Sequence, residues 1–208
     1  MTMGRTNNSN ARRTCTGTSL PFPTPETALQ CRLRKYYQKQ EGPGLCGIAS
    51  ATMAINAIHD KLHVKQQDVL RHIPKATRSG MNLAGIACLI KQYDCEADIY
   101  SVGVRELTQI KTFRDLLRRQ RIDETVTIVN YWQPALGVDR QLGHFSPLGE
   151  YDDATDTVLL LDVGNSATPY HARYVALVHL WKGLMTIDGQ GDNRGFVIVR
   201  CSRRKINH

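Results

Sequence analysis

The first half of the chain carries apolar residues in runs and spacings that predict helices. Residues 45–58 (LCGIASATMAINAI) are apolar nearly all round, so we expect a buried helix there. Residues 66–72 and 83–93 read as two further helices. Residues 104–121 predict a longer amphipathic helix, because Leu107, Ile110, Phe113 and Leu117 fall on one stripe.

The second half changes to β-branched and aromatic segments that predict strands. These are residues 125–132 (TVTIVNYW), 143–151 (GHFSPLGEY), 157–163 (TVLLLDV) and 196–200 (FVIVR). Residues 175–184 read as a helix between the last two. Helices followed by antiparallel strands define an α+β fold, not the alternating order of a doubly wound sheet.

The length of 208 residues suits one domain. We expect a basic, flexible N-terminal segment over 1–35, one domain over 36–200 and a basic C-terminal tail over 201–208. The domain divides into a helical half, 36–121, and a sheet half, 122–200. No run of about 18 apolar residues occurs, so we expect no membrane span.

The formal net charge of +8 lies in the two ends of the chain. Residues 1–35 and 200–208 hold ten basic residues and one acidic residue, whereas residues 36–199 hold 17 basic and 18 acidic residues. Folded nucleic-acid binders carry their basic charge on the domain itself. A nucleic-acid partner is therefore not expected, although a binding module driven by the basic ends stays an alternative.

The six cysteines form no CxxC pair and show no spacing of a small secreted scaffold. No apolar signal-peptide core precedes the domain, so we expect a reducing cytoplasm. The first 25 residues have the composition of an organellar transit peptide without its amphipathic period, which favours a plain tail.

Cys46 lies between a Gly/Pro turn and the predicted buried helix. A thiol at a helix N-terminus is favoured as thiolate, which makes it a candidate nucleophile. An inert buried cysteine is the alternative for this residue taken alone.

His144 and Asp162 stand at the ends of two predicted strands that can pair as a hairpin. Asp162 would then orient the His144 ring, and a Cys, His and Asp in this chain order are typical of papain-like enzymes. Gln40, six residues before Cys46, can supply an amide donor for an oxyanion.

Six short segments stand in one order across residues 38–200: Gln40 with Leu45–Ser50 (LCGIAS), 127–131 (TIVNY), 143–148 (GHFSPL), 160–163 (LLDV), 180–182 (LWK) and 194–196 (RGF). In these segments and their order the chain resembles the catalytic domain of phytochelatin synthases, as found alone in short bacterial members.

This resemblance implies a papain-like fold and a glutathione γ-glutamylcysteinyltransferase that also hydrolyses glutathione. Cys46 would be the nucleophile, His144 the base and then the acid, Asp162 the orienting residue and Gln40 the oxyanion donor. Gly143, Asp188 and Arg194 would bind the substrate, the last two at its γ-glutamyl end; the alternative for that pair is an ordinary surface ion pair.

The family resemblance also implies a role in heavy-metal detoxification. No protein metal site is expected, and acylation needs no cofactor. Cd²⁺ or Zn²⁺ would arrive as the metal–glutathione thiolate, and a homodimer is left open. Cys88 and Cys95 lie where relatives also carry cysteines, and we expect buried structural thiols rather than metal ligands.

The chain departs from the family pattern around the acyl-donor pocket. Asn165 and Ala167 stand where the family usually has Arg and Lys, the 188–194 loop is one residue shorter, and Gly42 replaces an acidic residue. The alternative function is therefore a papain-like peptidase acting on a peptide or protein, similar to Gly-Gly leader peptidases.

Overall fold

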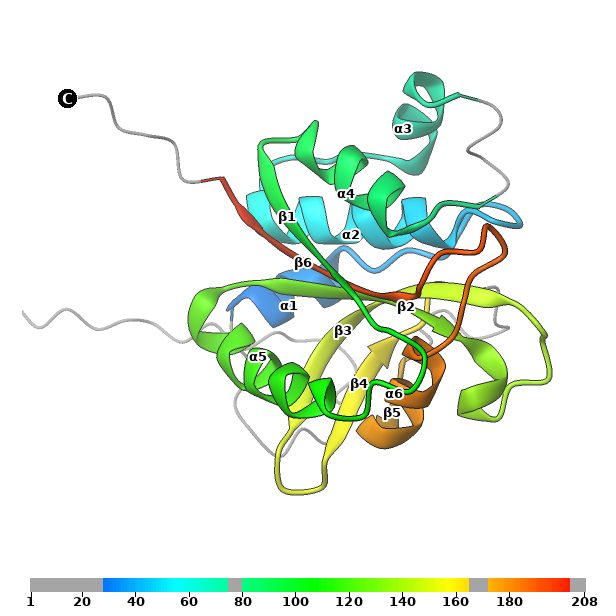
Figure 1. The fold of residues 1–208 in the computed structure, drawn as a ribbon. Coiled ribbons are helices and arrows are strands. Elements are labelled where there is room, and N and C mark those ends of the chain that lie inside the picture. Colours follow the sequence, from blue (N-terminus) through cyan, green and yellow to red (C-terminus); the bar gives the residue numbers. More distant parts are fainter. Residues whose placement is uncertain (1–27, 75–79, 165–171, 203–208) are drawn as a thin grey trace, which may run out of the picture.

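The computed structural model describes residues 28–74, 80–164 and 172–202, which form helices around one antiparallel sheet (Figure 1). The helices are α1 (Ala28–Lys35), α2 (Cys46–His59), α3 (Gln66–His72), α4 (Leu83–Lys91), α5 (Gln109–Asp123) and α6 (Leu177–Leu184), with a 3-10 turn η2 (Gln133–Leu136). The strands are β1 (Cys95–Ser101), β2 (Val126–Trp132), β3 (Gly143–Asp152), β4 (Thr157–Leu161), β5 (Ala172–Ala176) and β6 (Gly195–Cys201).

The six strands form a sheet in the order β1-β6-β2-β3-β4-β5, and each neighbouring pair is antiparallel. Helices α2, α3 and α4 lie on one side of it, and α5 and α6 lie on the other (Figure 1). This arrangement confirms the α+β class that the sequence predicts.

Both faces of the four inner strands β2, β3, β4 and β6 are mostly buried, which explains their long apolar runs. Neighbouring residues of one strand pack into different cores: Ile128 joins the core beneath α2 and α4, while Val129 joins the core against α5 and α6. Leu159 and Leu160 divide in the same way. Successive strand side chains point to opposite faces, so strands covered on both sides favour apolar residues on both faces.

Two strands are absent from the sequence prediction. β1 lies inside the predicted helical half and β5 occupies the start of the predicted 175–184 helix. The division into a helical half and a sheet half is therefore wrong, because β1 pairs with β6 along its whole length. Helix α5 begins at Gln109 rather than at 104, and Leu107 before it is 62% exposed, so it is not part of the buried stripe.

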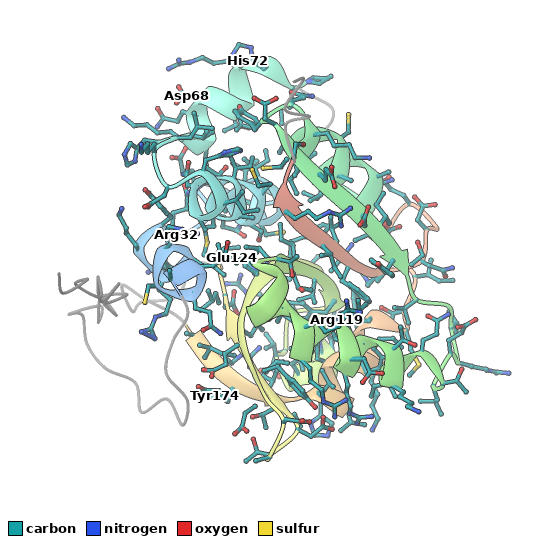
Figure 2. The ribbon with its side chains drawn as sticks, turned by 90° about the vertical axis from the view of Figure 1, so that its left-hand side faces the viewer. Arg32, Asp68, His72, Arg119, Glu124 and Tyr174 are labelled. Atoms are coloured by element: carbon teal, nitrogen blue, oxygen red, sulfur yellow. The ribbon has the colours of Figure 1, made fainter. Side chains whose placement is uncertain are left out.

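Helix α1 shows that the predicted start of the domain at residue 36 is wrong. Leu29 and Leu33 of this helix are buried in the core with α2. Arg32, labelled in Figure 2, donates from Nε to the carbonyl oxygen of Ala57 at 2.7 Å. Residues 28–35 thus belong to the folded domain, although their basic composition resembles the segment before them.

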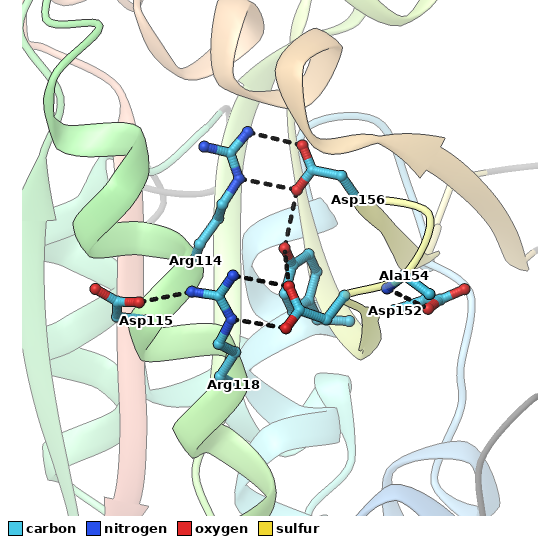
Figure 3. A network of polar contacts seen from close by, with 8 residues as sticks. Arg114, Asp115, Arg118, Asp152, Ala154 and Asp156 are labelled. Atoms are coloured by element: carbon cyan, nitrogen blue, oxygen red, sulfur yellow. Dashed lines mark hydrogen bonds and ion pairs between the residues drawn. The ribbon is translucent and has the colours of Figure 1, made fainter.

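The β3–β4 hairpin is held against α5 at its tip by two arginines (Figure 3). Arg114 donates to both carboxylate oxygens of Asp156 at 2.9 and 2.7 Å, and Arg118 does the same to Asp153 at 2.9 and 2.8 Å. Bidentate pairs fix orientation as well as distance. The hairpin that carries His144 is therefore anchored at the end opposite to that residue.

Among the described residues, every helix is too short or too polar to reach across a bilayer.

Candidate active site

Cys46 is the first residue of α2 and is half-buried. The positive end of the helix dipole therefore lies at its thiol. Burial raises the pKa of Cys46, but hydrogen bonding to His144 and the charge of His144 lower it, with smaller help from the backbone of Phe145 and Gly47. The net pKa lies below that of an ordinary cysteine, which favours the thiolate.

His144 and Asp162 meet across the β3–β4 hairpin, as the sequence predicts. Both side chains are buried, and His144 Nε2 lies 2.8 Å from Asp162 Oδ1. Because Nε2 is engaged by the carboxylate, Nδ1 is the ring nitrogen left for the Cys46 thiol. The His144 ring also stands edge-on to Tyr131, with ring centroids 5.8 Å apart.

The protonation of His144 follows from its contacts with Asp162 and Cys46. Burial lowers its pKa, but hydrogen bonds to Asp162 and Cys46 raise it, and the net pKa is raised to about 9. A lowered thiol pKa beside a raised imidazole pKa favours transfer of the thiol proton to the imidazole, which gives a thiolate–imidazolium pair.

Asp162 is itself fixed by the segment around it. Its Oδ1 accepts the backbone N–H of Gly164 at 2.8 Å, and its carbonyl oxygen accepts the Tyr37 hydroxyl at 2.6 Å. A Cβ at Gly164 would meet Asp162 Oδ1 at 2.9 Å, so glycine leaves room for the carboxylate. Tyr37 is a supporting residue that the sequence analysis missed.

Gln40 lies in the turn that leads to Cys46, and its backbone N–H donates to the Val163 carbonyl at 2.8 Å. Its side-chain amide donates to the Gly42 carbonyl at 2.8 Å. An amide nitrogen carries two hydrogens, so one donor remains for another acceptor. Gln40 is thereby tied to the strand end that bears Asp162.

Arg194 is 4% exposed, so the surface-pair alternative for this residue is wrong. Its Nη1 donates to Asn130 Oδ1 at 2.7 Å, and its guanidinium lies 5.7 Å from the Trp132 ring centroid. A Cβ on Gly143 would overlap this guanidinium. Arg194 therefore occupies the space beside the residue that precedes His144.

The charge of Arg194 is incompletely matched in the described structure. Its Nε has no hydrogen-bond partner among the described residues. Burial lowers the pKa of Arg194, while the charges of Asp188 and Cys46 act in the opposite direction. A buried guanidinium with one neutral partner and one empty donor can pair with an anion.

Asp188 sits in the loop between α6 and β6, where its Oδ1 accepts the backbone N–H groups of Gln190 and Asp192 at 2.8 and 3.0 Å. Asn82, at the start of α4, reaches this loop with Nδ2 at 3.2 Å from Gln190 Oε1 and 3.0 Å from Asp192 Oδ2. Figure 1 shows the loop rising towards α4. The loop is thus attached to the helices on the other side of the sheet.

Asn130, Trp132 and Asn82 are further residues that the sequence analysis missed. Asn130 carried one usable signal, since a polar residue inside the apolar run 125–132 must find a buried partner.

Asn165 and Ala167, which depart from the family pattern, lie outside the described residues. Cys95 is buried as predicted, but Cys88 is exposed, which contradicts the prediction for that residue.

A sheet flanked by helices, with a thiol at a helix start and a histidine on a neighbouring strand, defines the papain-like class of fold. A solved structure of a putative C39-like peptidase from Bacillus anthracis shares this fold, with a TM-score of 0.50 and 11% identity over 80% of this chain and 95% of that one. The chain belongs to the phytochelatin synthase family, whose sequence model matches residues 24–196.

Relatives in this family are named glutathione gamma-glutamylcysteinyltransferases. Two of them, numbered 1 and 3, come from Lotus japonicus and are 26% and 30% identical over 84% and 83% of this chain. A third, from Schizosaccharomyces pombe, is 23% identical over 77% of the chain. The chain spans 36%, 38% and 40% of their respective lengths.

Proposed function

We propose that the chain is a thiol acyltransferase and hydrolase that cleaves the Cys–Gly bond of glutathione through an acyl-enzyme on Cys46. The observation that carries the proposal is the placement of Arg194. A buried, incompletely paired guanidinium packs against Gly143, next to His144, and acts electrostatically on Cys46. Family membership and the names of the relatives point to the same substrate.

In the acylation step, the Cys46 thiolate attacks the carbonyl carbon of the cysteinyl residue of glutathione. The oxyanion that forms accepts hydrogen bonds from the Cys46 backbone N–H and from Gln40. His144, protonated and held by Asp162, gives its proton to the departing glycine amine. The C–N bond breaks, glycine leaves, and a γ-Glu-Cys thioester remains on Cys46.

In the deacylation step, neutral His144 removes a proton from the acceptor that attacks the thioester. Water as acceptor gives free γ-Glu-Cys, and the amine of a second glutathione gives phytochelatin. Either product restores the Cys46 thiolate and the His144 imidazolium. We expect hydrolysis to be at least as fast as polymer formation.

The γ-glutamyl end of glutathione carries a carboxylate and an ammonium on one carbon. The carboxylate would pair with the Arg194 guanidinium, whose Nε has no other partner among the described residues, and Asp188 would balance the ammonium. An α-linked peptide places no such carboxylate there, so Arg194 favours glutathione over a Gly-Gly leader peptide.

Cd²⁺ or Zn²⁺ would enter with the substrate as a glutathione thiolate. Within the described parts of the chain, no group of three His, Cys, Asp or Glu side chains is arranged to hold a metal ion.

The test is mass spectrometry of the protein incubated with glutathione, with and without Cd²⁺. We expect a γ-Glu-Cys adduct on Cys46, free γ-Glu-Cys and released glycine, and longer oligomers if a second glutathione is used as acceptor. Cys46→Ser should lower glycine release by about 10³-fold or more. Cys88→Ser, at an exposed position of α4, is the matched control and should keep wild-type turnover.

Glycine release by Cys46→Ser at the wild-type rate would rule out the proposal. A parallel assay with an α-linked Gly-Gly peptide separates the two functions. Turnover of that peptide without turnover of glutathione would assign the chain to the peptidase alternative.

A further inference from the structure

Two cysteines outside the active site face each other at one end of the β1–β6 pair. Cys95 and Cys201 are direct partners in the antiparallel register. Directly opposed residues of such a pair project from the same face of the sheet, with their Cβ atoms adjacent. Both thiols are free in the structure.

The hydrogen bonds around the ladder define which kind of pair this is. The Val102 N–H donates to the Arg194 carbonyl at 2.8 Å, and the Ser202 N–H donates to the Asp94 carbonyl at 3.1 Å. The register between these two positions is unbroken, and hydrogen-bonded pairs recur at every second residue. Cys95 and Cys201, one step inside the Asp94–Ser202 pair, therefore form a non-hydrogen-bonded pair.

This class of pair brings side chains closest together. Its Cα atoms are about 4.5 Å apart, and disulfides join cysteines whose Cα atoms are about 4.4–6.8 Å apart. A bond between Cys95 and Cys201 therefore requires side-chain rotation but no movement of the backbone.

The two thiols differ in accessibility. Cys201 is exposed, whereas Cys95 is 3% exposed. Burial, with smaller effects from Cys201 and Asp94, raises the pKa of Cys95 to about 12. An oxidant in solution therefore meets Cys201 first, and Cys95 reacts only with the sulfur beside it.

His59 stands on the inner side of Cys95. Its Nε2 lies 2.7 Å from the Tyr93 carbonyl and 3.3 Å from Cys95 Sγ. A carbonyl only accepts, so Nε2 carries the hydrogen, and the same N–H is near enough to donate to a thiolate at Cys95. The His59 N–H can thus stabilise the Cys95 thiolate when that thiolate forms.

We propose that Cys95 and Cys201 are a redox modification site that closes to a cross-strand disulfide by exchange with a small disulfide such as glutathione disulfide. The Cys201 thiolate attacks one sulfur of glutathione disulfide, forms a mixed disulfide and releases one glutathione thiolate. Cys95 loses its proton to solvent and attacks Cys201 Sγ, and the second glutathione leaves as its thiolate. Two protein thiols are oxidised and one glutathione disulfide is reduced to two glutathione molecules.

The disulfide would join β6 to β1, which is the edge strand of the sheet. It closes a chain segment of more than 100 residues, and cross-links over segments of that length restrict the unfolded chain strongly. Arg194 lies at the far end of the same ladder, so the bond stabilises the β1–β6 pair without touching the proposed substrate contacts.

The test starts from Cys46→Ser protein, which removes the reactive nucleophile, treated with glutathione disulfide and analysed by intact mass and peptide mapping without reductant. We expect a loss of two hydrogens and a Cys95–Cys201 cross-linked peptide. The melting temperature should rise by about 5–10 °C, and dithiothreitol should reverse both changes.

Three further substitutions in the same background give the controls. Cys95→Ala should stop at a glutathione mixed disulfide on Cys201, and Cys201→Ser should leave Cys95 unmodified. Cys88→Ser, which removes another exposed thiol, should still close the bond. Three outcomes would each overturn the proposal. They are retention of both thiols, a mixed disulfide that persists when Cys95 is present, and cross-linking of either cysteine to another residue. Because no readout involves turnover, the result does not depend on the proposed function.

Discussion

Cys46 and His144 set each other's protonation in a site where His144 is buried and Cys46 is half-buried. The His144 charge lowers the pKa of the thiol, and the thiol helps to raise the pKa of the imidazole to about 9. The pair therefore titrates as a unit, and both pKa shifts favour thiolate with imidazolium. Asp162 adds to this preference, because its carboxylate stabilises the imidazolium.

The first prediction concerns the pH dependence of this pair. The imidazolium is present below its raised pKa, so glutathione acylation should rise as Cys46 ionises and fall as pH passes about 9. Asp162→Asn removes a contact that raises the His144 pKa, so the alkaline limb should move to lower pH and kcat/KM should fall by roughly 10²-fold.

The pH profile of iodoacetamide alkylation of Cys46 checks this without substrate. Asp98→Asn changes a surface carboxylate of β1 and is the control. An Asp162→Asn profile that coincides with wild type would contradict the role given to Asp162.

The second prediction concerns Gly143. A methyl group there would overlap the Arg194 guanidinium, so Gly143→Ala should displace that side chain and raise the KM for glutathione by about tenfold or more. Alkylation of Cys46 should change little. Gly189→Ala adds a methyl group in open space on the neighbouring loop and should match wild type in both assays. Equal KM values for the two variants would show that Arg194 does not contribute to the binding of glutathione.

Among single residues, the sequence predicted those with recognisable chemistry and missed those that support them. Cys46, His144 and Asp162 carry signals in their neighbours: a turn before a helix, and two strand ends on one hairpin. Trp132 acts through its position beside Arg194, and Tyr37 through a hydroxyl directed at the Asp162 carbonyl. Such contacts join segments far apart in the chain, and a local pattern does not encode them.

Helix α5 and the β3–β4 hairpin show how one element fixes another. Arg114 and Arg118 lie one helical turn apart and meet Asp156 and Asp153 at the hairpin tip (Figure 3). The Tyr151 hydroxyl also donates to Asp156 at 2.9 Å, so the tip is a network rather than two isolated pairs. The attachment of this tip to α5 therefore restrains the whole β3–β4 hairpin, including the strand end that carries His144.

The third prediction tests this attachment. Arg114→Ala should lower the free energy of unfolding by about 1 kcal/mol, because the bidentate pair is partly shielded from solvent. The loss should shrink as salt is added. Lys111→Ala, on the exposed side of the same helix, should cost less than about 0.5 kcal/mol. Urea denaturation measures both, and equal losses would show that the pair contributes nothing beyond helix propensity.

The sequence predicted those helices and strands in which the apolar residues along the chain coincide with the buried positions. α2 is apolar all round and buried all round, and α3 begins and ends at the predicted residues. β1 was missed because Glu96 and Asp98 interrupt its apolar residues; both carboxylates pair with Arg200 on β6, which became visible only in the structure. β5 is short and runs directly into α6, so its apolar residues read as the first turn of that helix.

The described part of the molecule is nearly neutral, with 19 basic and 18 acidic residues. Several of its arginines are matched by carboxylates, among them Arg114, Arg118 and Arg200. The positive excess therefore belongs mainly to residues outside the described ranges. The candidate active site instead includes the buried guanidinium of Arg194, which suits a small anionic group better than a polyanion.

The fourth prediction tests where the folded domain begins. Removal of residues 1–27 should leave the melting temperature and glutathione turnover close to those of the full chain. Removal of residues 1–35 also deletes Leu29 and Leu33 from the core, which should cost about 4 kcal/mol or more. Thermal denaturation followed by circular dichroism compares the two, and equal melting temperatures would place α1 outside the cooperative unit.

The distance along the chain between Cys46 and the groups that activate it has a consequence for biosynthesis. His144 follows Cys46 by 98 residues, and Arg194 follows later still. At about 5–20 residues per second, a ribosome needs about 5–20 s to add the histidine after the cysteine. Until then Cys46 lacks the partner that lowers its pKa, so the nascent chain carries an ordinary thiol. The lowered thiol pKa thus arises only once the hairpin has been made and folded onto α2. Under the proposed function, the growing chain would therefore be acylated more slowly than the folded protein.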